Sequence, residues 1–329
     1  MRTYYLGVDI GGTKCAAVLG MPEDGQAHVL DRICMPTQPQ SGLQSTLDRL
    51  YETIDALLQR NHLQPGRLRA IGVSCGGPLD SAAGRILSPP NLYGWDDVPI
   101  TALLTQRYGV PAWLQNDANA CVLAEWKFGA ARGCRNAVFL TFGTGMGAGL
   151  ILDKRLYLGT NGMSGEVGHI RLSEHGPVGY GKEGSFEGFC SGGGIPQLAR
   201  TMVLELLQQG KPCAYCRSLA ELDGITAKAV ADAALAGDET AMAVYRRCAV
   251  YLGRGLSVLI DILNPEVIVI GSIFERSEQL LRQPMLETIG KEALASSAAC
   301  CRIVPASFGD RLGDIAALSV AMSEEEECV

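Results

Sequence analysis

Apolar residues are arranged twice along the chain as two short runs that flank a glycine-rich turn. The first arrangement covers residues 4–20 (YYLGVDIGGTKCAAVLG), and the second covers residues 137–152 (AVFLTFGTGMGAGLIL). Each predicts a β-hairpin, because apolar runs on both sides of a glycine turn are typical of paired strands. A turn without Cβ atoms lets backbone N–H groups approach an anion closely. The repetition therefore predicts that a phosphate chain is held from two sides.

The rest of the pattern alternates helices and strands. An apolar run at residues 68–73 is predicted to be a strand and ends in a Gly76-Gly77-Pro78 turn. Residues 80–96 and 159–194 are predicted to be loops. Helices are predicted at residues 43–59, 99–108, 115–128, 195–208, 226–236, 238–262 and 312–322. Strands are predicted at residues 110–114, 267–270 and 302–305.

This order predicts the domain organisation. A hairpin followed by alternating strands and helices recurs in both halves in degraded form, so the chain is predicted to be a doubled α/β protein with an interdomain cleft. We place the N-terminal domain at residues 1–115 plus 306–329 and the C-terminal domain at residues 116–305. A length of 329 residues agrees with two domains, each large enough for its own core.

Charge and hydropathy narrow the possible partners. The net charge of −7 without a basic run argues against nucleic acid as the main partner, whereas nucleotide phosphates need only local positive charge. The apolar stretch 249–271 is interrupted by Arg254, Asp261 and Asn264-Pro265. It predicts a buried helix and a strand in place of a membrane span.

The cysteines indicate the compartment. Twelve cysteines without a framework spacing predict reduced thiols in the cytoplasm. Cys213 and Cys216 form a lone C-x-x-C pair, and without a second pair at zinc-ribbon spacing we favour unliganded thiols. The chain enters a strand almost at once, which predicts that no signal peptide precedes the fold.

Two well-known phosphate motifs are excluded. Thr13 and Lys14 stand in the wrong order for the G-K-[ST] end of a P-loop. Gly143, Gly145 and Ala148 fit the looser dinucleotide pattern G-x-G-x-x-A, but that pattern needs a helix immediately afterwards. Here a strand and a turn follow, so we reject it.

The first turn carries side chains suited to phosphate and metal. Asp9 can hold a metal ion directly or through water, Thr13 offers a hydroxyl group, and Lys14 offers a point charge for phosphate. An ordinary β-hairpin turn is the alternative. The second turn and the downstream residues favour the functional interpretation.

Asn116 and Asp117 stand where a strand is predicted to end and a helix to begin. Capping of the helix start explains the presence of one such residue well, but it explains the presence of both Asn116 and Asp117 poorly. The helix dipole would keep Asp117 ionised, so that it can accept a hydroxyl proton as a general base. In phosphoryl transfer the protein supplies positioning, charge neutralisation and such a base.

Further polar residues suit a sugar. Sugar hydroxyl groups are bound by carboxylates and amides, and the chain offers Asn116, Glu166, His169 and Glu187. A lone loop histidine is usually a satisfied surface residue. Its convergence with a candidate base favours a binding role for His169.

The chain resembles the ROK family of bacterial sugar kinases, regulators and uncharacterised reading frames. The resemblance spans nearly the whole chain. The matching motifs are DIGGTK at 9–14, GPLD at 77–80, NDANA at 116–120, AEWKFGAARG at 124–133, GTGMGAGLI at 143–151, GEVGH at 165–169, EGFCSG at 187–192, VIVIGS at 267–272 and LGDIAAL at 312–318. It implies the actin-like, ribonuclease H-like ATPase fold, a homodimer, and ATP with Mg²⁺ as the phosphoryl source.

The resemblance also implies roles for individual residues. Asp117 would be the base toward the 6-hydroxyl group of a hexose. Sugar binding would involve Gly77 (through its backbone), Asn116, Glu166, His169 and Glu187. ATP phosphates and Mg²⁺ would be held by Asp9, Gly11, Gly12, Thr13 and Lys14, with Asp9 toward the metal. The second phosphate turn would consist of Gly143, Thr144 and Gly145, and Gly271 would lie near the adenosine.

One stretch departs from the family pattern. The family usually has three cysteines of a zinc site between the histidine and the following glutamate, and here Val178, Tyr180 and Ser185 replace them. One imidazole without thiolates cannot form a closed tetrahedral site, so we predict no zinc. Packing of Tyr180 and Phe186 is expected to orient His169 instead.

Three functions compete. The leading prediction is an ATP-dependent hexose 6-kinase acting on glucose or an N-acetylhexosamine such as N-acetylmannosamine. A sugar-responsive regulator would need a DNA-binding domain, for which the sequence leaves no residues before the first strand, and a basic face. The third possible function is that of a non-catalytic sugar-binding protein. The presence of both Asp9 and Asp117 argues against it.

Overall fold

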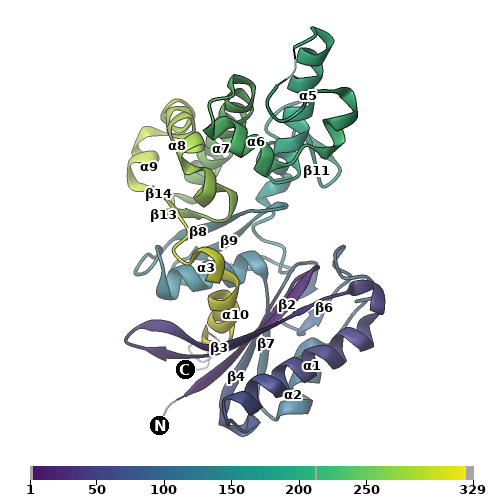
Figure 1. The fold of residues 1–329 in the computed structure, drawn as a ribbon. Helices are drawn as coiled ribbons and strands as arrows, with labels where there is room; N and C mark the ends of the chain where they lie inside the picture. Colours follow the sequence, from purple (N-terminus) through teal and green to yellow (C-terminus); the bar gives the residue numbers. More distant parts are fainter. Residues whose placement is uncertain (1–2, 212, 324–329) are drawn as a thin grey trace. The chain divides into compact units, whose positions relative to one another are not determined.

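The structure is a computed structural model that describes residues 3–211 and 213–323 (Figure 1). The chain forms two compact units. The first unit comprises the described residues within 1–134, 149–164 and 307–329. The second unit comprises the described residues within 135–148 and 165–306. Among the described residues, no helix combines the length and the apolar character needed to cross a lipid bilayer.

The first unit contains a mixed five-stranded sheet of order β3-β2-β1-β4-β7. Strands β1, β2 and β3 form an antiparallel meander, and β4 and β7 extend it in parallel to β1. The strands are β1 (Tyr4–Ile10), β2 (Lys14–Glu23), β3 (Gln26–Pro36), β4 (Leu68–Cys75) and β7 (Ala112–Asn116). The region predicted as loop after β4 contains the short pair β5 (Leu79–Asp80) and β6 (Arg85–Ile86).

Successive side chains of the strands point to opposite faces of this sheet, so each face contributes to a separate hydrophobic core. Leu6, Val8 and Ile10 of β1 point to one face, where they pack in a core with helix α1 (Leu43–Arg60) and helix α2 (Ile100–Tyr108). Apolar residues of α1 recur at helical spacing, so one side of the helix is buried in that core. The predicted helix at residues 43–59 is thereby confirmed.

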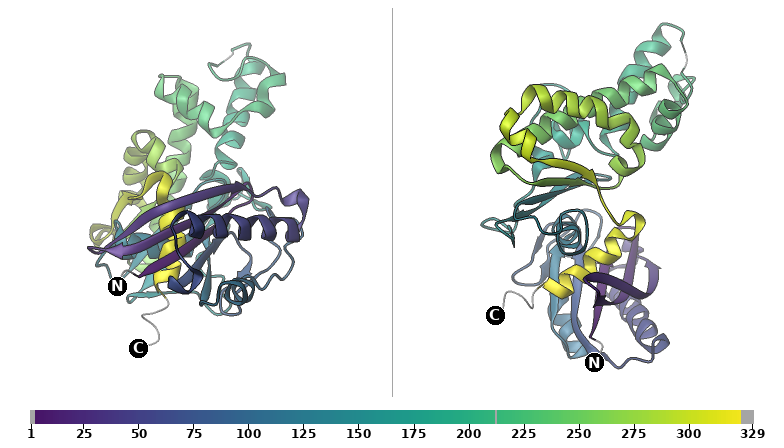
Figure 2. Two further views of the ribbon diagram at one scale, coloured as in Figure 1. Left: turned by 60° about the horizontal axis from the view of Figure 1, so that its bottom comes forward. Right: turned by 90° about the vertical axis from the view of Figure 1, so that its left-hand side faces the viewer.

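The opposite face of the sheet is covered by the last helix, α10 (Leu312–Ser323) (Figures 1 and 2). Gly7, Gly20 and Gly72 lie under this helix on adjacent strands. A Cβ atom at Gly72 would lie 2.3 Å from Ala317 O, and one at Gly7 would lie 2.9 Å from Leu318 N. The glycines therefore let the helix backbone lie directly on the strands.

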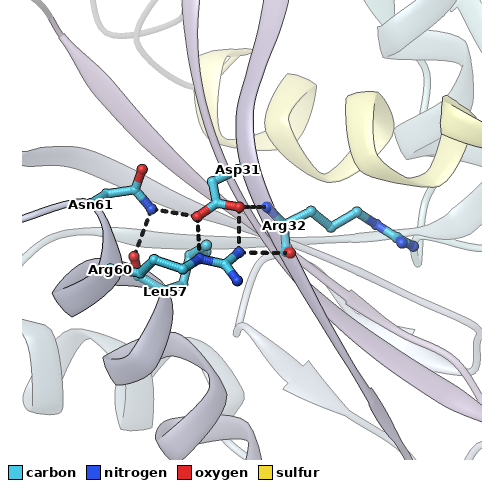
Figure 3. Close-up of polar contacts among 5 residues, drawn as sticks. All are labelled: Asp31, Arg32, Leu57, Arg60 and Asn61. Carbon is cyan, nitrogen blue, oxygen red and sulfur yellow. Dashed lines mark hydrogen bonds and ion pairs between the residues drawn. The ribbon is translucent and has the colours of Figure 1, made fainter.

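Neighbouring residues of β3 tie these two layers to the sheet. The carboxylate of Asp31 accepts hydrogen bonds from Arg60 Nε at 2.6 Å and from Asn61 Nδ2 at 2.7 Å, both at the end of α1 (Figure 3). Arg32 points away from this cluster, and its Nε donates to Asp314 Oδ1 of α10 at 2.7 Å. Successive side chains of a strand point to opposite faces, so one dipeptide anchors both covering helices.

A second five-stranded sheet has the order β10-β9-β8-β13-β14. Its strands are β8 (Ala137–Phe142), β9 (Met146–Leu152), β10 (Arg155–Leu156), β13 (Val267–Ile270) and β14 (Arg302–Pro305). A small hairpin of β11 (Val178–Gly179) and β12 (Lys182–Glu183) lies in the region predicted as glycine-rich loop. The helices of the second unit are α4 (Phe186–Phe189), α5 (Gly194–Gln208), α6 (Ala227–Leu235), α7 (Glu239–Leu263), α8 (Ile273–Glu292) and α9 (Ala295–Cys300).

Several features differ from the sequence-based expectations. Helix α3 (Asp117–Phe128), which we placed in the C-terminal domain, packs against α10 and belongs to the first unit. Helix α8 was not predicted. Its polar sequence gives little apolar periodicity, and it contains Pro284 and a non-helical kink at Ser277.

The packing of α10 on the sheet generates a stability prediction. We expect Gly72→Ala to lower the free energy of unfolding by about 3 kcal/mol, because the added methyl group would overlap Ala317 O and Ala321 N. Gly66→Ala is the matched control, since no heavy atom lies within 4 Å of a Cβ atom there. Thermal and urea unfolding measure both variants. Equal stability of the two would show that α10 does not lie as close to β4 as described.

Candidate active site

The carboxyl ends of the parallel strands β1, β4 and β7 meet at one edge of the first sheet. The register pairs Ile10 with Cys75 and Cys75 with Asn116, so Asp9 and Asp117 approach the same edge from distant parts of the sequence. In open α/β sheets, ligands bind beyond the carboxyl ends of the strands. This edge is therefore the candidate site of the first unit.

The first glycine turn connects β1 and β2 at this edge. Gly11 N donates to Lys14 O at 3.0 Å, which closes the turn. A Cβ atom at Gly12 would lie 2.6 Å from Asn91 Cβ, so the backbone passes this neighbour only because the residue is glycine. The side chains of Thr13 and Lys14 are exposed. The turn thus has a fixed shape and offers a hydroxyl group and a cation to a ligand.

Asp9 lies against the first turn of α10, within a concentration of negative charge. A Cβ atom at Gly313 would lie 3.0 Å from Asp9 Oδ2, so the carboxylate reaches the helix start. Burial, followed by the charges of Asp314 and Asp117, raises the pKa of Asp9 to about 6, while Lys14 and Arg32 act in the opposite direction. Burial and like charges thus make the ionised form of Asp9 unfavourable in the ligand-free protein.

The environment of Asp9 fits Mg²⁺. Carboxylate oxygens are hard ligands, and a divalent cation would relieve the repulsion that raises the pKa of this group. No group of three or more ligating side chains that would hold a metal occurs among the described residues. Mg²⁺ typically uses one or two carboxylates together with phosphate oxygens and water. Asp9 therefore suits a metal ion that is bound together with a nucleotide.

Asn116 and Asp117 form the start of α3. Asn116 Oδ1 accepts from Asn119 N at 2.7 Å, so Asn116 is the N-cap of the helix, and Asp117 Oδ1 accepts from Ala118 N at 2.8 Å. Asp117 as a residue keeps part of its surface open to solvent. Asn116 thus caps the helix, and Asp117 presents a carboxylate next to it.

Two opposing effects act on the pKa of Asp117. Desolvation by the surrounding protein raises the pKa of its carboxyl group, although the N–H groups of Ala118 and of Asp117 itself act to lower it. The N–H groups at the helix start therefore lower the pKa in the expected direction, and desolvation outweighs them. A carboxylate with a raised pKa is the stronger base when it is ionised.

Gly77 follows β4 at the same edge. Its backbone is exposed, and the nearest heavy atom to a Cβ atom there would be Leu79 N at 3.9 Å. The open surroundings leave the peptide groups of this turn accessible to a ligand.

The second glycine turn lies in the second unit, at the end of β8. Gly143 N donates to Gly145 O at 3.1 Å, and Gly192 N donates to Gly143 O at 2.7 Å. The turn containing Thr144 is therefore fixed by the segment that leads into α5, another glycine-rich stretch.

Glu187 lies at this second turn. Its Oε2 accepts from Met146 N at 3.0 Å, and a Cβ atom at Gly145 would lie 2.7 Å from the same oxygen. Gly168 and Gly179 also leave room for the Glu187 side chain. We placed Glu187 among the sugar ligands, and the structure adds that one of its oxygens accepts a hydrogen bond at the second glycine turn.

His169 and Glu166 lie in a short 3-10 segment and its N-cap, and both are exposed. The His169 ring meets Tyr180 edge-on, with 6.4 Å between ring centroids, as we expected. Phe186 is fully buried and packs against Gly255, so no comparable role for it is seen. Tyr180 is 81% exposed at the tip of the β11–β12 hairpin and has a φ of 43°.

Gly271 ends β13 beside the second turn. Gly271 N donates to Leu140 O at 3.1 Å, and a Cβ atom at Gly271 would lie 3.0 Å from Phe139 Cζ. Ser272 follows with φ 57° and ψ −103°, and its Oγ lies 3.9 Å from a Cβ position at Gly143. Such strained backbone is often found at functional sites.

Sequence reasoning assigned no role to three of these neighbours. Asp314 and Arg32 set the charge around Asp9, and Ser272 approaches the second turn. The motif LGDIAAL contains Asp314, but only the fold shows that it approaches Asp9. Ser272 gave no signal, because its backbone strain is invisible in the sequence.

Two glycine turns, each at the end of a strand of a five-stranded sheet, define an α/β protein with a doubled sheet architecture. The chain belongs to the ROK family, which matches residues 5–324. It is similar to the glucokinase of Halalkalibacterium halodurans, with 32% identity over 314 residues that cover 95% of this chain and 93% of that protein.

Solved structures of the family have the same fold. A ROK hexokinase from Thermus thermophilus has a TM-score of 0.80 and 28% identity, covering 98% of this chain and 99% of that chain. A ROK family glucokinase from Streptomyces griseus, in complex with glucose and AMPPNP, has a TM-score of 0.76 and 27% identity, covering 97% and 99%. The predicted actin-like ATPase fold is confirmed.

Regulators of the family are similar as well. The transcriptional repressor Mlc from Escherichia coli is 28% identical over 252 residues, which cover 75% of this chain and 59% of that protein. Membership of the family therefore supports a sugar kinase without fixing the sugar.

The charge around Asp9 generates a pH-dependent prediction. The pKa of Asp9 is higher in the folded protein than its ordinary value of 3.8, so ionisation of this group opposes folding. The penalty is absent below about pH 4, grows as the pH rises, and is complete above about pH 6. Asp9→Asn should therefore raise the free energy of unfolding of the ligand-free protein at pH 8 by about 1 to 3 kcal/mol.

Unfolding of the wild type and of Asp9→Asn at several pH values measures this effect, and the exposed Asp223→Asn serves as control. The gain from Asp9→Asn should shrink between pH 6 and pH 4. A variant that is less stable than the wild type at pH 8 would contradict the described charge environment.

Proposed function

We propose that this protein is an ATP-dependent kinase that phosphorylates the 6-hydroxyl group of a hexose, glucose or an N-acetylhexosamine such as N-acetylmannosamine. One observation carries the proposal: the carboxylate of Asp117, with its raised pKa, stands at the same sheet edge as Asp9 and the first glycine turn. Similarity to glucokinases supports it. The homodimer and the lack of a nucleic-acid partner stay predictions.

Each residue has a role in the proposed reaction. Asp117 accepts the proton of the sugar 6-hydroxyl group, and that oxygen bonds to the γ-phosphorus of ATP while the bond from γ-phosphorus to the β–γ bridging oxygen breaks. The products are ADP and the hexose 6-phosphate, with the proton on Asp117. Asp9 would hold Mg²⁺, which would supply charge neutralisation at the phosphates.

The remaining residues bind and orient the substrates. Lys14, Thr13 and the backbone of Gly11 and Gly12 hold phosphate at the first turn, and the turn 143–145 provides a second set of backbone groups. Gly271 lies toward the adenosine. The sugar is bound by Asn116, Glu166, His169, Glu187 and the backbone of Gly77. The proposed reaction requires the phosphate-binding residues and the sugar-binding residues to act on one ATP molecule and one sugar molecule together.

A non-catalytic sugar-binding or regulatory protein is the second candidate. The similarity to the repressor Mlc favours it. The presence of Asp9 and Asp117 argues for turnover. The two candidates differ in one measurable property, which is sugar-dependent consumption of ATP.

A sugar panel tests the kinase. We expect ATP consumption with one or a few of glucose, fructose, allose, mannose, N-acetylglucosamine and N-acetylmannosamine. Asp117→Asn should lower kcat by about 100- to 10,000-fold, because the variant has no base to take the hydroxyl proton. Sugar affinity, measured by calorimetry, should change little.

Asp223→Asn, an exposed aspartate of the second unit, is the control and should retain full activity. If Asp117→Asn turns over at the wild-type rate, the base is assigned wrongly. Sugar binding without ATP consumption by the wild type would support the second candidate instead.

We also propose that the β11–β12 hairpin takes the place of a zinc site. Val178, Tyr180 and Ser185 occupy the family's cysteine positions, and Ser185 caps α4 through a hydrogen bond from Gly188 N at 3.1 Å. Lys182 Nζ donates to His169 O at 2.8 Å, so the hairpin holds both the backbone and the ring of His169.

Tyr180→Ala should therefore raise the KM for the sugar several-fold and leave the KM for ATP unchanged, because it removes only the contact that orients the His169 ring. Tyr180→Phe retains the ring and is the matched control. Elemental analysis of the purified protein should find no stoichiometric zinc. Zinc that is lost in His169→Ala would refute the proposal.

A further inference from the structure

A cavity lies wholly in the first unit, apart from the candidate active site. It has a volume of about 500 Å³ and is formed by the end of α3, the β2–β3 turn, the β9–β10 turn, the start of β1 and the end of α10. This volume is within the range of small-molecule sites. None of the residues assigned to the proposed reaction lines it.

Among the residues that the structure describes, three cations and no carboxylate line this cavity. They are Lys127, Arg132 and Lys154. The Arg132 guanidinium lies over Gly25, where a Cβ atom would be 2.8 Å from Nη2. The structure gives the side chains of Arg132 and Lys154 no hydrogen bond or ion pair with any described residue. In a chain of net charge −7, such a cluster of basic groups favours an anion.

The rest of the lining is aromatic and apolar. Tyr5, Trp126 and Phe128 contribute rings, and Met322 contributes a thioether side chain. Trp126 Nε1 donates to Cys134 O at 2.9 Å, which fixes the indole ring. Tyr5 is buried. Aromatic walls beside basic groups suit a ligand with a planar ring and an anionic group.

Three elements connect this cavity with the candidate active site. Strand β1 carries Tyr5 near its start and Asp9 near its end. Helix α3 begins at Asp117 and ends at Phe128. Helix α10 begins near Asp9 and ends near Met322. A ligand that shifts any of these elements at the cavity would move a site carboxylate or its neighbour at the other end.

We propose that this cavity is a second ligand site for a small phosphorylated or carboxylated compound with a planar ring, and that its occupancy is coupled to nucleotide binding. The first part does not depend on kinase activity. Arg132 and Lys154 hold the anionic group, and Trp126 and Phe128 flank the ring.

Isothermal titration calorimetry with phenyl phosphate tests the site in the full chain. The double variant Arg132→Gln/Lys154→Gln should bind roughly 10- to 100-fold more weakly than the wild type, because two charge-assisted contacts are lost. The control is Arg67→Gln/Lys291→Gln, which removes two exposed cations outside the cavity and should bind like the wild type. Inorganic phosphate should bind more weakly than phenyl phosphate, since it lacks the ring.

Equal binding by the wild type and the Arg132/Lys154 variant overturns the site, because the phosphate then binds elsewhere, for instance at the glycine turns. The sequence continues after Ser323 with four glutamates, 324–327. If phenyl phosphate binds only after all four are changed to glutamine, an acidic segment of the chain is the occupant, and the proposal of a free ligand fails.

The coupling has a separate test. Saturating phenyl phosphate should change the dissociation constant of AMPPNP with Mg²⁺ by about 5-fold or more in the wild type and not in the Arg132/Lys154 variant. AMPPNP should change phenyl phosphate binding by the same factor. Independent binding of the two compounds overturns the coupling, and absence of AMPPNP binding would instead count against the proposed kinase.

Discussion

Direct contact between the backbone of α10 and the glycines of the first sheet fixes the candidate site. Because Gly7 and Gly72 have no side chains, the helix lies on β1 and β4 at a distance that no Cβ atom would allow. This contact brings Gly313 to the carboxylate of Asp9 and places Asp314 where Arg32 can bind it. The position of the last helix, more than 300 residues after Asp9, thereby decides the electrostatics of the first glycine turn.

Repulsion between neighbouring carboxylates makes the candidate site electrostatically unfavourable in the ligand-free protein. Asp9, Asp314 and Asp117 are close enough that the latter two raise the pKa of Asp9. An arrangement of like charges is unfavourable in the ligand-free protein and becomes favourable when a cation joins them. Proteins commonly sacrifice stability at functional sites in this way. The strained backbone of Ser272 at the second turn is a comparable case.

Local signals were sufficient for much of the fold. The glycine turns, the helix at residues 43–60 and the strand-to-helix junction at Asn116 follow from periodicity and capping, which act over a few residues. Helix α8 escaped prediction because its apolar pattern is weak and it contains Pro284. The assignment of α3 to the first unit was not predicted either, because its packing against α10 is a contact between segments far apart in the chain.

The sequence by itself determined which chemical groups are available: two glycine turns, a carboxylate at Asp9, a candidate base at Asp117 and a histidine loop without the family's cysteines. Only the tertiary structure decided the state of those groups. The pKa values of Asp9 and Asp117, the contact of Glu187 with the second turn and the basic cavity at the end of α3 arise from burial and from neighbours distant in sequence. Residue type fixes which charges and hydrogen bonds are possible, whereas desolvation and proximity depend on how the whole chain packs.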